Sequence, residues 1–250
     1  MKEKIISIKN KKWLELLFWV VWPIFVFYAI QYILAAILGL LFKDDLQNFA
    51  DSSVFTAVYS AVVYLIIFAG IYFIPKYLFK QKISKKNTGI SGLPTWTDIG
   101  LGFAGLIIAM ILSGIITAIA TSIFPNFNAN ETQDVGFSNL SQSYQYLTAF
   151  FALVVIAPIV EELVFRGVIY SKMREVSPWL AIILVSLMFG AAHGQWNVGI
   201  TTFTMSVIMC LIREKLTDTI WAGIILHMLK NAIAFYFLFM APEILQTITQ

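Results

Sequence analysis

Charge is scarce in this 250-residue chain. Asp, Glu, Lys and Arg make up only 12% of the residues, whereas 59% are hydrophobic. Soluble domains carry roughly a quarter charged residues. Several mostly apolar runs are also longer than the ~18 residues needed to cross a bilayer. The composition therefore excludes an ordinary soluble domain and predicts an all-α, polytopic helical membrane protein.

Cysteine and the common hydrolase motifs are scarce as well. Cys210 is the only cysteine, so it cannot form an intramolecular disulfide, and its apolar surroundings predict a packing role. The chain has no His-Glu-x-x-His sequence, which argues against a conventional zincin site, and no Gly-x-Ser-x-Gly turn. The net charge is only +3 and is explained by membrane topology, so we expect no nucleic-acid partner.

The apolar runs predict about seven transmembrane helices. Their approximate bounds are Leu14–Phe42, Val54–Ile74, Asp98–Phe124, Tyr146–Tyr170, Trp179–His193, Val198–Leu211 and Thr219–Met240. The fifth and sixth runs are short, so we expect a hairpin whose Gly194–Asn197 turn stays within the membrane. Irregular backbone cannot face lipid, so this turn should line a wet cavity. We expect one transmembrane domain at 1–250, with N-terminal helices at 1–125 and a catalytic core at 146–240.

Basic residues are distributed unevenly between the two sides of these helices. Lysine and arginine gather in the N-terminal tail and near the connections that follow the second, fourth and sixth helices. The connection from Pro125 to Tyr146 contains none. The positive-inside rule then predicts a multi-pass cell-membrane protein with a cytoplasmic N-terminus and an extracytoplasmic C-terminus.

Three ionisable residues interrupt the fourth helix, where Val154 to Gly167 reads VVIAPIVEELVFRG. Each such group costs roughly 2.5–3.5 kcal/mol at bilayer depth, so it is usually present for chemistry, transport or internal pairing. Glu162 and Arg166 are four residues apart and can pair on one face. Glu161 is turned by about 100° from Glu162 and needs a different partner. The alternative is a single structural ion cluster.

The only two histidines also lie in apolar runs. His193 follows Phe189 by one helical turn, and Asn231 follows His227 by one turn. A lone membrane histidine often makes only an interhelical hydrogen bond. Two histidines, an asparagine and a separate glutamate on three helices instead favour one polar intramembrane site.

These side chains suit hydrolysis of an amide within the membrane. Glu161, assisted by His193, could deprotonate water, because burial makes a carboxylate a better base. His227 and Asn231 could stabilise the oxyanion with side-chain N–H groups. Alternatively, His193, His227 and Glu161 bind zinc, which activates the water. A non-enzymatic immunity or scaffold protein and a transporter with a buried relay are the other interpretations.

The motifs resemble a known family when they are taken together and in order. Glu161-Glu162-x-x-x-Arg166, Phe189-x-x-x-His193 and His227-x-x-x-Asn231 are similar to the motifs of the CAAX-protease and bacteriocin-processing family, CPBP or Abi. The resemblance covers roughly Tyr146 to Phe239. It implies an α-helical membrane endopeptidase that acts on a membrane-embedded or membrane-associated peptide or protein.

In that family the first glutamate and the middle histidine are assigned to water activation, and the last histidine and asparagine to the oxyanion. The resemblance carries these roles to Glu161, His193, His227 and Asn231, with Glu162, Arg166 and Phe189 in support. Both zinc-dependent and metal-free mechanisms are argued for the family. Its eukaryotic members trim prenylated CAAX proteins, and its bacterial-looking members are linked to bacteriocin maturation, self-immunity or regulated proteolysis. Lys230 stands where many relatives have a neutral polar residue.

Overall fold

The described chain is a bundle of helices. The computed structural model describes residues 2–42, 52–81, 83–84, 86–133, 135–137 and 140–244, with side chains from residue 11 onward, and within these ranges it has no strand. The helices are α1 (Lys2–Leu41), α3 (Ser53–Tyr77), α4 (Trp96–Ile123), α5 (Ser143–Phe150), η1 (Phe151–Ile156), α6 (Ala157–Glu162), η2 (Leu163–Tyr170), α7 (Ser171–Met173), α8 (Pro178–Ala191), α9 (Trp196–Ile212), η3 (Arg213–Thr217), α10 (Trp221–Phe235) and η4 (Tyr236–Met240).

Most helix bounds agree with the sequence prediction to within a few residues. In the described part of the chain, six helices are long and apolar enough to cross a membrane, and α8 is a shorter apolar one. The predicted all-α, polytopic membrane protein is therefore confirmed. Two bounds were wrong. The helix α1 begins at Lys2 rather than near Leu14, and the helix that starts at Trp196 continues to Thr217 instead of ending near Leu211.

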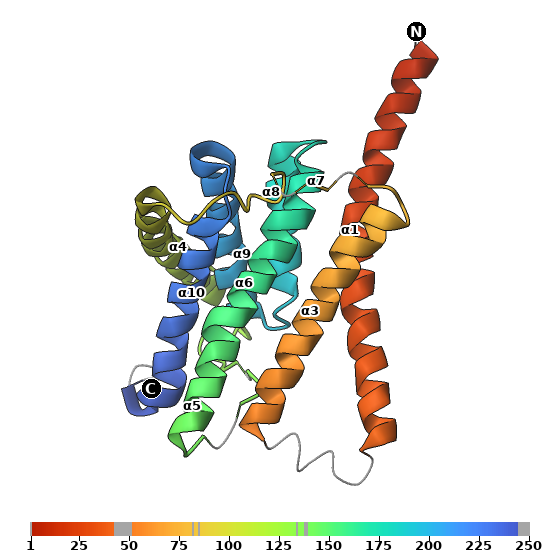
Figure 1. Cartoon of the computed structure of the whole chain (residues 1–250). Helices are drawn as coiled ribbons and strands as arrows, with labels where there is room; N and C mark the ends of the chain where they lie inside the picture. Colours follow the sequence, from red (N-terminus) through yellow and green to blue (C-terminus); the bar gives the residue numbers. More distant parts are fainter. Residues whose placement is uncertain are drawn as a thin grey trace.

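The bundle is built around the continuous helix from Ser143 to Met173, which comprises α5, η1, α6, η2 and α7. It contacts α3 on one side and α10 on the other, and α1 packs against α3 (Figure 1). The largest hydrophobic core lies between α1, α3, this continuous helix and α8. The middle turns of the 143–173 helix are therefore surrounded by protein rather than lipid. A charged side chain can be tolerated in such surroundings.

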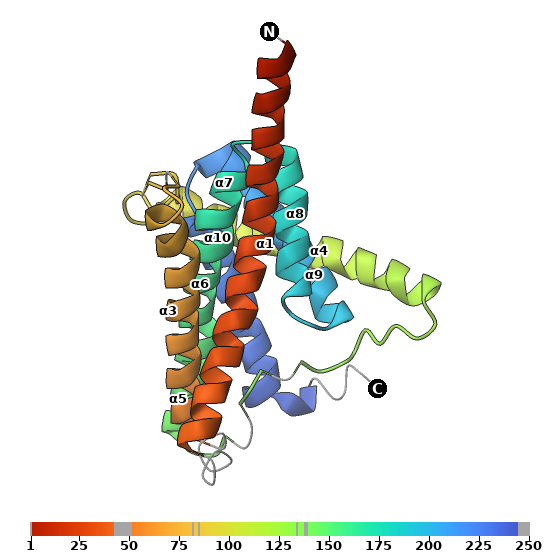
Figure 2. The same ribbon diagram turned by 90° about the vertical axis from the view of Figure 1, so that its right-hand side faces the viewer.

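The helix α4 departs from the bundle direction. It leaves the other helices at a steep angle and its C-terminal half projects outward (Figure 2). Contact with α9 and α10 is confined to its first half, where Gly102 and Gly105 face the two helices. A Cβ at Gly102 would lie 2.7 Å from Cγ2 of Ile225, so only glycine permits this close crossing.

The helices α8 and α9 form the predicted hairpin, and its turn lies partway along the bundle rather than at its end (Figure 1). The two helices cross so closely that a Cβ at Gly190 would lie 2.9 Å from the carbonyl oxygen of Gly199. The connection between α4 and α5 passes beneath the turn (Figure 2). It is tied there by Nδ2 of Asn197, which donates to the carbonyl oxygen of Glu131 at 2.7 Å.

One end of the bundle gathers the segments that the sequence predicts to be cytoplasmic. The N-terminus of α1, the C-terminus of α3 and the connections from α7 to α8 and from α9 to α10 share this end (Figure 1). The arrangement is consistent with a single topology, in which the basic segments face one compartment.

Candidate active site

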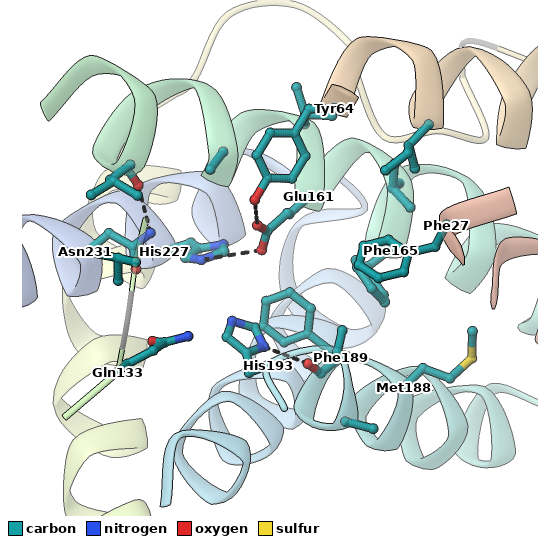
Figure 3. Close-up of a pocket in the computed structure, with 18 of the residues that line it drawn as sticks. Phe27, Tyr64, Gln133, Glu161, Phe165, Met188, Phe189, His193, His227 and Asn231 are labelled. Atoms are coloured by element: carbon teal, nitrogen blue, oxygen red, sulfur yellow. Dashed lines mark hydrogen bonds and ion pairs between the residues drawn. The ribbon is translucent and has the colours of Figure 1, made fainter. Parts of the chain in front are cut away.

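A cavity of about 650 Å³ lies inside the bundle between α1, α3, the 143–173 helix, α8 and α10. The side chains of Glu161, His193, His227 and Asn231 all line it, although they come from three separate helical segments. Figure 3 shows the four side chains directed toward a common space. The structure thus brings together the four residues in which the sequence predicts the chemistry.

Asn231 is held against the π-helical segment η1. Its Nδ2 donates a hydrogen bond to the carbonyl oxygen of Leu153 at 2.8 Å (Figure 3). In π-helical register this carbonyl would accept from residue 158, but Pro158 has no N–H. Asn231 therefore satisfies a backbone carbonyl that the helix itself leaves unpaired. This bond uses only one of the two N–H bonds of its amide.

We expect Asn231→Ala to destabilise the protein by about 1–3 kcal/mol, because the Leu153 carbonyl loses its donor. Adding Pro158→Ala should recover part of this loss, since the new backbone N–H can serve the same carbonyl. Unfolding of the purified single and double variants in detergent measures both effects. If the two changes in the free energy of unfolding simply added in the double variant, residues 231 and 158 would be independent and would not share the Leu153 carbonyl.

Glu162 forms the buried centre of an ion-pair network. Its Oε1 lies 2.8 Å from Nη1 of Arg166, as the i,i+4 spacing predicts. The same oxygen lies 3.2 Å from Nδ1 of His227, and both Glu162 and His227 are almost fully buried. The close approach of α10 depends on Gly223, where a Cβ would lie 3.0 Å from Oε2 of Glu162. Glu162 therefore orients the imidazole of His227, a function that the sequence did not indicate.

Glu161 points away from this ion pair and into the cavity. The hydroxyl of Tyr64 donates to its Oε1 at 2.9 Å, and its Oε2 lies 3.9 Å from Nε2 of His227. Figure 3 shows the carboxylate between the two side chains. The expectation that Glu161 needs a partner other than Arg166 is met by Tyr64. The hydroxyl of Tyr64 on α3 holds Oε1 in place, and Oε2 faces the cavity.

Replacing Tyr64 by Phe should lower the turnover number by about tenfold with little change in KM, because an unanchored carboxylate spends less time aligned for proton transfer. Steady-state kinetics on the purified protein test this expectation. Tyr72→Phe is the matched control, since Tyr72 lies on the same helix and its hydroxyl accepts a hydrogen bond from Lys76 at 3.4 Å. Equal effects of the two substitutions would contradict the anchoring function.

His193 lies in the turn that follows α8, not at the end of the helix as the sequence predicted. Gly194 adopts a φ of +71°, which lets the chain turn immediately after this histidine. Nδ1 of His193 lies 2.8 Å from the carbonyl oxygen of Phe189, so Nδ1 carries the proton and Nε2 of the neutral ring is an acceptor. Nε2 faces the cavity (Figure 3).

The ring of Phe189 forms the common wall behind these groups. It makes edge contacts with His193 and His227, with ring centroids 5.1 and 5.6 Å apart. The guanidinium of Arg166 lies over the same ring at 4.3 Å. Phe189 thus holds the two imidazoles and the arginine in fixed relative positions, which agrees with its predicted supporting place.

A zinc site on His193, His227 and Glu161 was the alternative that the sequence left open. Nowhere in the part of the chain that the structure describes do three His, Cys, Asp or Glu side chains lie close enough to hold one metal ion. Nδ1 of each histidine faces a protein oxygen, as it does in many zinc sites that bind the metal through Nε2, so only the spacing of the donors argues against zinc. As arranged, these donors do not fit a zinc ion.

Several cavity residues were missed by the sequence analysis. Tyr64 and Phe27 come from the N-terminal helices, and Gln133 comes from the connection between α4 and α5 (Figure 3). None stands in a motif, and each is separated from Glu161 by tens of residues. Lys230 also lines the cavity; in the sequence it stands out only as a departure from relatives, which does not place it in the site.

Comparison with known proteins identifies related sequences for the C-terminal half. Residues 143–233 match the family model of the type II CAAX prenyl endopeptidase Rce1-like family. The chain is also 33% identical over 107 residues to the membrane-embedded CAAX protease MroQ of Staphylococcus aureus (strain USA300). That similarity covers 40% of this chain and 43% of the relative, so it spans less than half of the relative's length. No solved structure shows a significant match.

Proposed function

We propose that this chain belongs to the CPBP family through its Rce1-like segment at residues 143–233 and that it is an intramembrane endopeptidase of the CAAX-protease type. One observation supports this function above all. The carboxylate of Glu161 lies inside a helical membrane protein, 3.9 Å from an imidazole nitrogen, and opens onto a cavity that two further polar side chains share.

In this proposal Glu161 is the general base. Tyr64 holds Oε1, so Oε2 is the oxygen that accepts a proton from a water molecule in the cavity. The acceptor nitrogen of His193 faces the same space and helps to orient that water. The hydroxide equivalent then attacks the carbonyl carbon of the scissile peptide. A positioned base of this kind contributes about 10²–10⁴-fold to the rate.

The proton must next reach the leaving nitrogen so that the C–N bond can break. Oε2 of Glu161 and Nε2 of His227 are close enough for a proton to pass between them through small movements. Glu162 accepts a hydrogen bond from the Nδ1–H of His227 and stabilises the imidazolium that forms. The protonated imidazole and the remaining N–H of Asn231 provide donors for the oxyanion. As the intermediate collapses, Nε2 of His227 gives its proton to the leaving nitrogen and the C–N bond breaks, so the products are a carboxylate and an amine.

The surroundings favour a substrate that arrives through the membrane. The cavity wall is mostly apolar and includes side chains from α1 and α3. We assign the bundle end with the basic connections to the cytoplasm, which gives a cytoplasmic N-terminus and an extracytoplasmic C-terminus. The partner in this proposal is a membrane-embedded or membrane-associated peptide or protein.

A comparison of membrane proteomes tests the function. Cells that express the wild-type chain should accumulate new protein termini in the membrane fraction, and cells that express Glu161→Gln at equal levels should not. Identical termini in the two samples would contradict the proposal. If the variant also kept the cellular phenotype, a non-enzymatic immunity or scaffold protein would be the better interpretation.

A further inference from the structure

Lys230 introduces a positive charge into the cavity. It lies on α10 three residues after His227 and one before Asn231, and all three side chains line the cavity. Positions separated by three or four residues share one face of a helix, so this placement follows from the helical spacing. Within the described part of the chain, no other lysine or arginine lines the cavity.

Among the residues that the structure describes, no side chain pairs with the ammonium of Lys230. No described residue gives it a hydrogen bond or an ion pair within 4.0 Å. The oxygens of the Glu161 carboxylate face Tyr64 and His227 instead. An unpaired charge among apolar groups is costly, and a bound anion would remove that cost.

The position of Lys230 defines where such an anion would lie. The three-residue step from His227 corresponds to about 4.5 Å along the axis of α10. An extended peptide advances by about 3.3–3.6 Å per residue. Nε2 of His227 lies a further 3.9 Å from Oε2 of Glu161, so an anionic group beside Lys230 is within about three residues of a peptide bond placed at Glu161.

The cavity has two chemically different ends. Phe27, Phe165 and Met188 gather on one side of Glu161, and Asn231, His193 and Gln133 lie on the other (Figure 3). Lys230, which precedes Asn231 on α10, also lines this cavity. A ligand that matches this division has an apolar part and, close to the bond that is cleaved, a negatively charged part.

We propose that Lys230 binds a carboxylate of the substrate, either the C-terminal carboxylate or an Asp or Glu side chain, within about three residues of the scissile bond. The inference rests on the proposed function, because it treats the cavity as the substrate site. Lys230 is then a specificity determinant, whereas Glu161 performs the proton transfer. The competing explanation is that Lys230 only balances the charge of Glu161.

Binding can be measured separately from cleavage. Three probes are titrated against the purified full-length protein in detergent. They are N-acetyl-trileucine with a free carboxylate, the same peptide as its C-terminal amide, and N-acetyl-Leu-Asp-Leu amide. The two acids differ in the source of the carboxylate, and the neutral amide reports the apolar contribution alone. Lys230→Gln removes the charge at similar length, Lys230→Arg retains it, and Lys215→Gln removes a charge at the end of the bundle.

The wild-type protein should bind at least one acid about tenfold more tightly than the neutral amide, as expected for a charge-assisted hydrogen bond. The acid that is preferred identifies the source of the carboxylate. Lys230→Gln should reduce the ratio to about one, whereas Lys230→Arg and Lys215→Gln should leave it high. Equal binding of the three probes by the wild-type protein would overturn the proposal, and so would a ratio that Lys230→Gln leaves unchanged.

The outcomes separate this inference from the proposed function. A charge preference that depends on Lys230, in a protein that cleaves nothing, would retain the carboxylate site and refute the peptidase. Cleavage of a peptide without any preference for the acids would retain the peptidase and refute the carboxylate site. If Lys230 only balances Glu161, then Lys230→Gln should lower the turnover number and leave the acid-to-amide ratio as in the wild type. Thermal unfolding of each variant ensures that only folded protein is compared.

Discussion

The Glu161→Gln protein is expected to fold normally and to lose hydrolysis by about 10³-fold or more. The amide oxygen of glutamine can still accept the hydroxyl of Tyr64, so the contact with α3 is retained. The amide cannot take up a proton from water at neutral pH, and the general base is lost. Because the two side chains have the same shape, the cavity and its apolar wall should not change.

Cleavage kinetics of the reconstituted protein, together with its unfolding temperature, provide the measurement. Glu175→Gln is the matched control, because Glu175 is exposed and pairs with Lys172, away from the cavity. It should keep full activity. If Glu161→Gln retained more than a tenth of the wild-type rate, Glu161 would not be the base, and the proton acceptor would have to be sought in His193 or His227.

Arg166→Met should cause the largest loss of stability, about 3–5 kcal/mol, because it leaves the buried carboxylate of Glu162 without its main partner. Methionine fills a similar volume and retains contact with Phe189, so the loss reports the charge more than the packing. Denaturation in mixed detergent micelles measures this change. Activity per folded molecule should fall as well, since Glu162 also orients His227.

The double variant Glu162→Gln with Arg166→Met is the informative control. Removing both charges should cost less than removing Arg166 alone, because no uncompensated buried ion remains. Arg174→Met provides the comparison at the end of the bundle, since Arg174 is partly exposed and pairs with Glu214 at 2.8 Å and with the exposed Asp218 at 3.6 Å, and it should cost less than Arg166→Met. If the double variant lost as much free energy of unfolding as the two single variants together, the pairing of Glu162 with Arg166 would be contradicted.

The helices were predictable from the sequence because hydropathy acts locally. A run of apolar residues has to become a helix in lipid, whatever its neighbours are. The two errors have the same origin. The turns of α1 before Leu14 and the extension from Arg213 to Thr217 are polar enough to lie outside lipid, and hydropathy therefore does not report their helical state.

The motif residues were predictable for a different reason. An ionisable group in an apolar helix is expensive and so stands out, which applies to Glu161, Glu162, Arg166 and both histidines. Helical geometry then separated Glu161 from the Glu162–Arg166 pair, and the structure has that arrangement. The chemistry assigned to these groups stays a prediction until the variants are measured.

The sequence alone determined that the chain spans the membrane as helices and that a few polar groups lie within it, because both depend on the cost of exposing charge and backbone to lipid. Tertiary structure decided which groups meet. Tyr64 reaches Glu161 across 97 residues of chain, Asn231 reaches the Leu153 carbonyl across 78, and Lys230 lines the same cavity. Such contacts depend on how helices pack against one another, and no local pattern of residues encodes that packing.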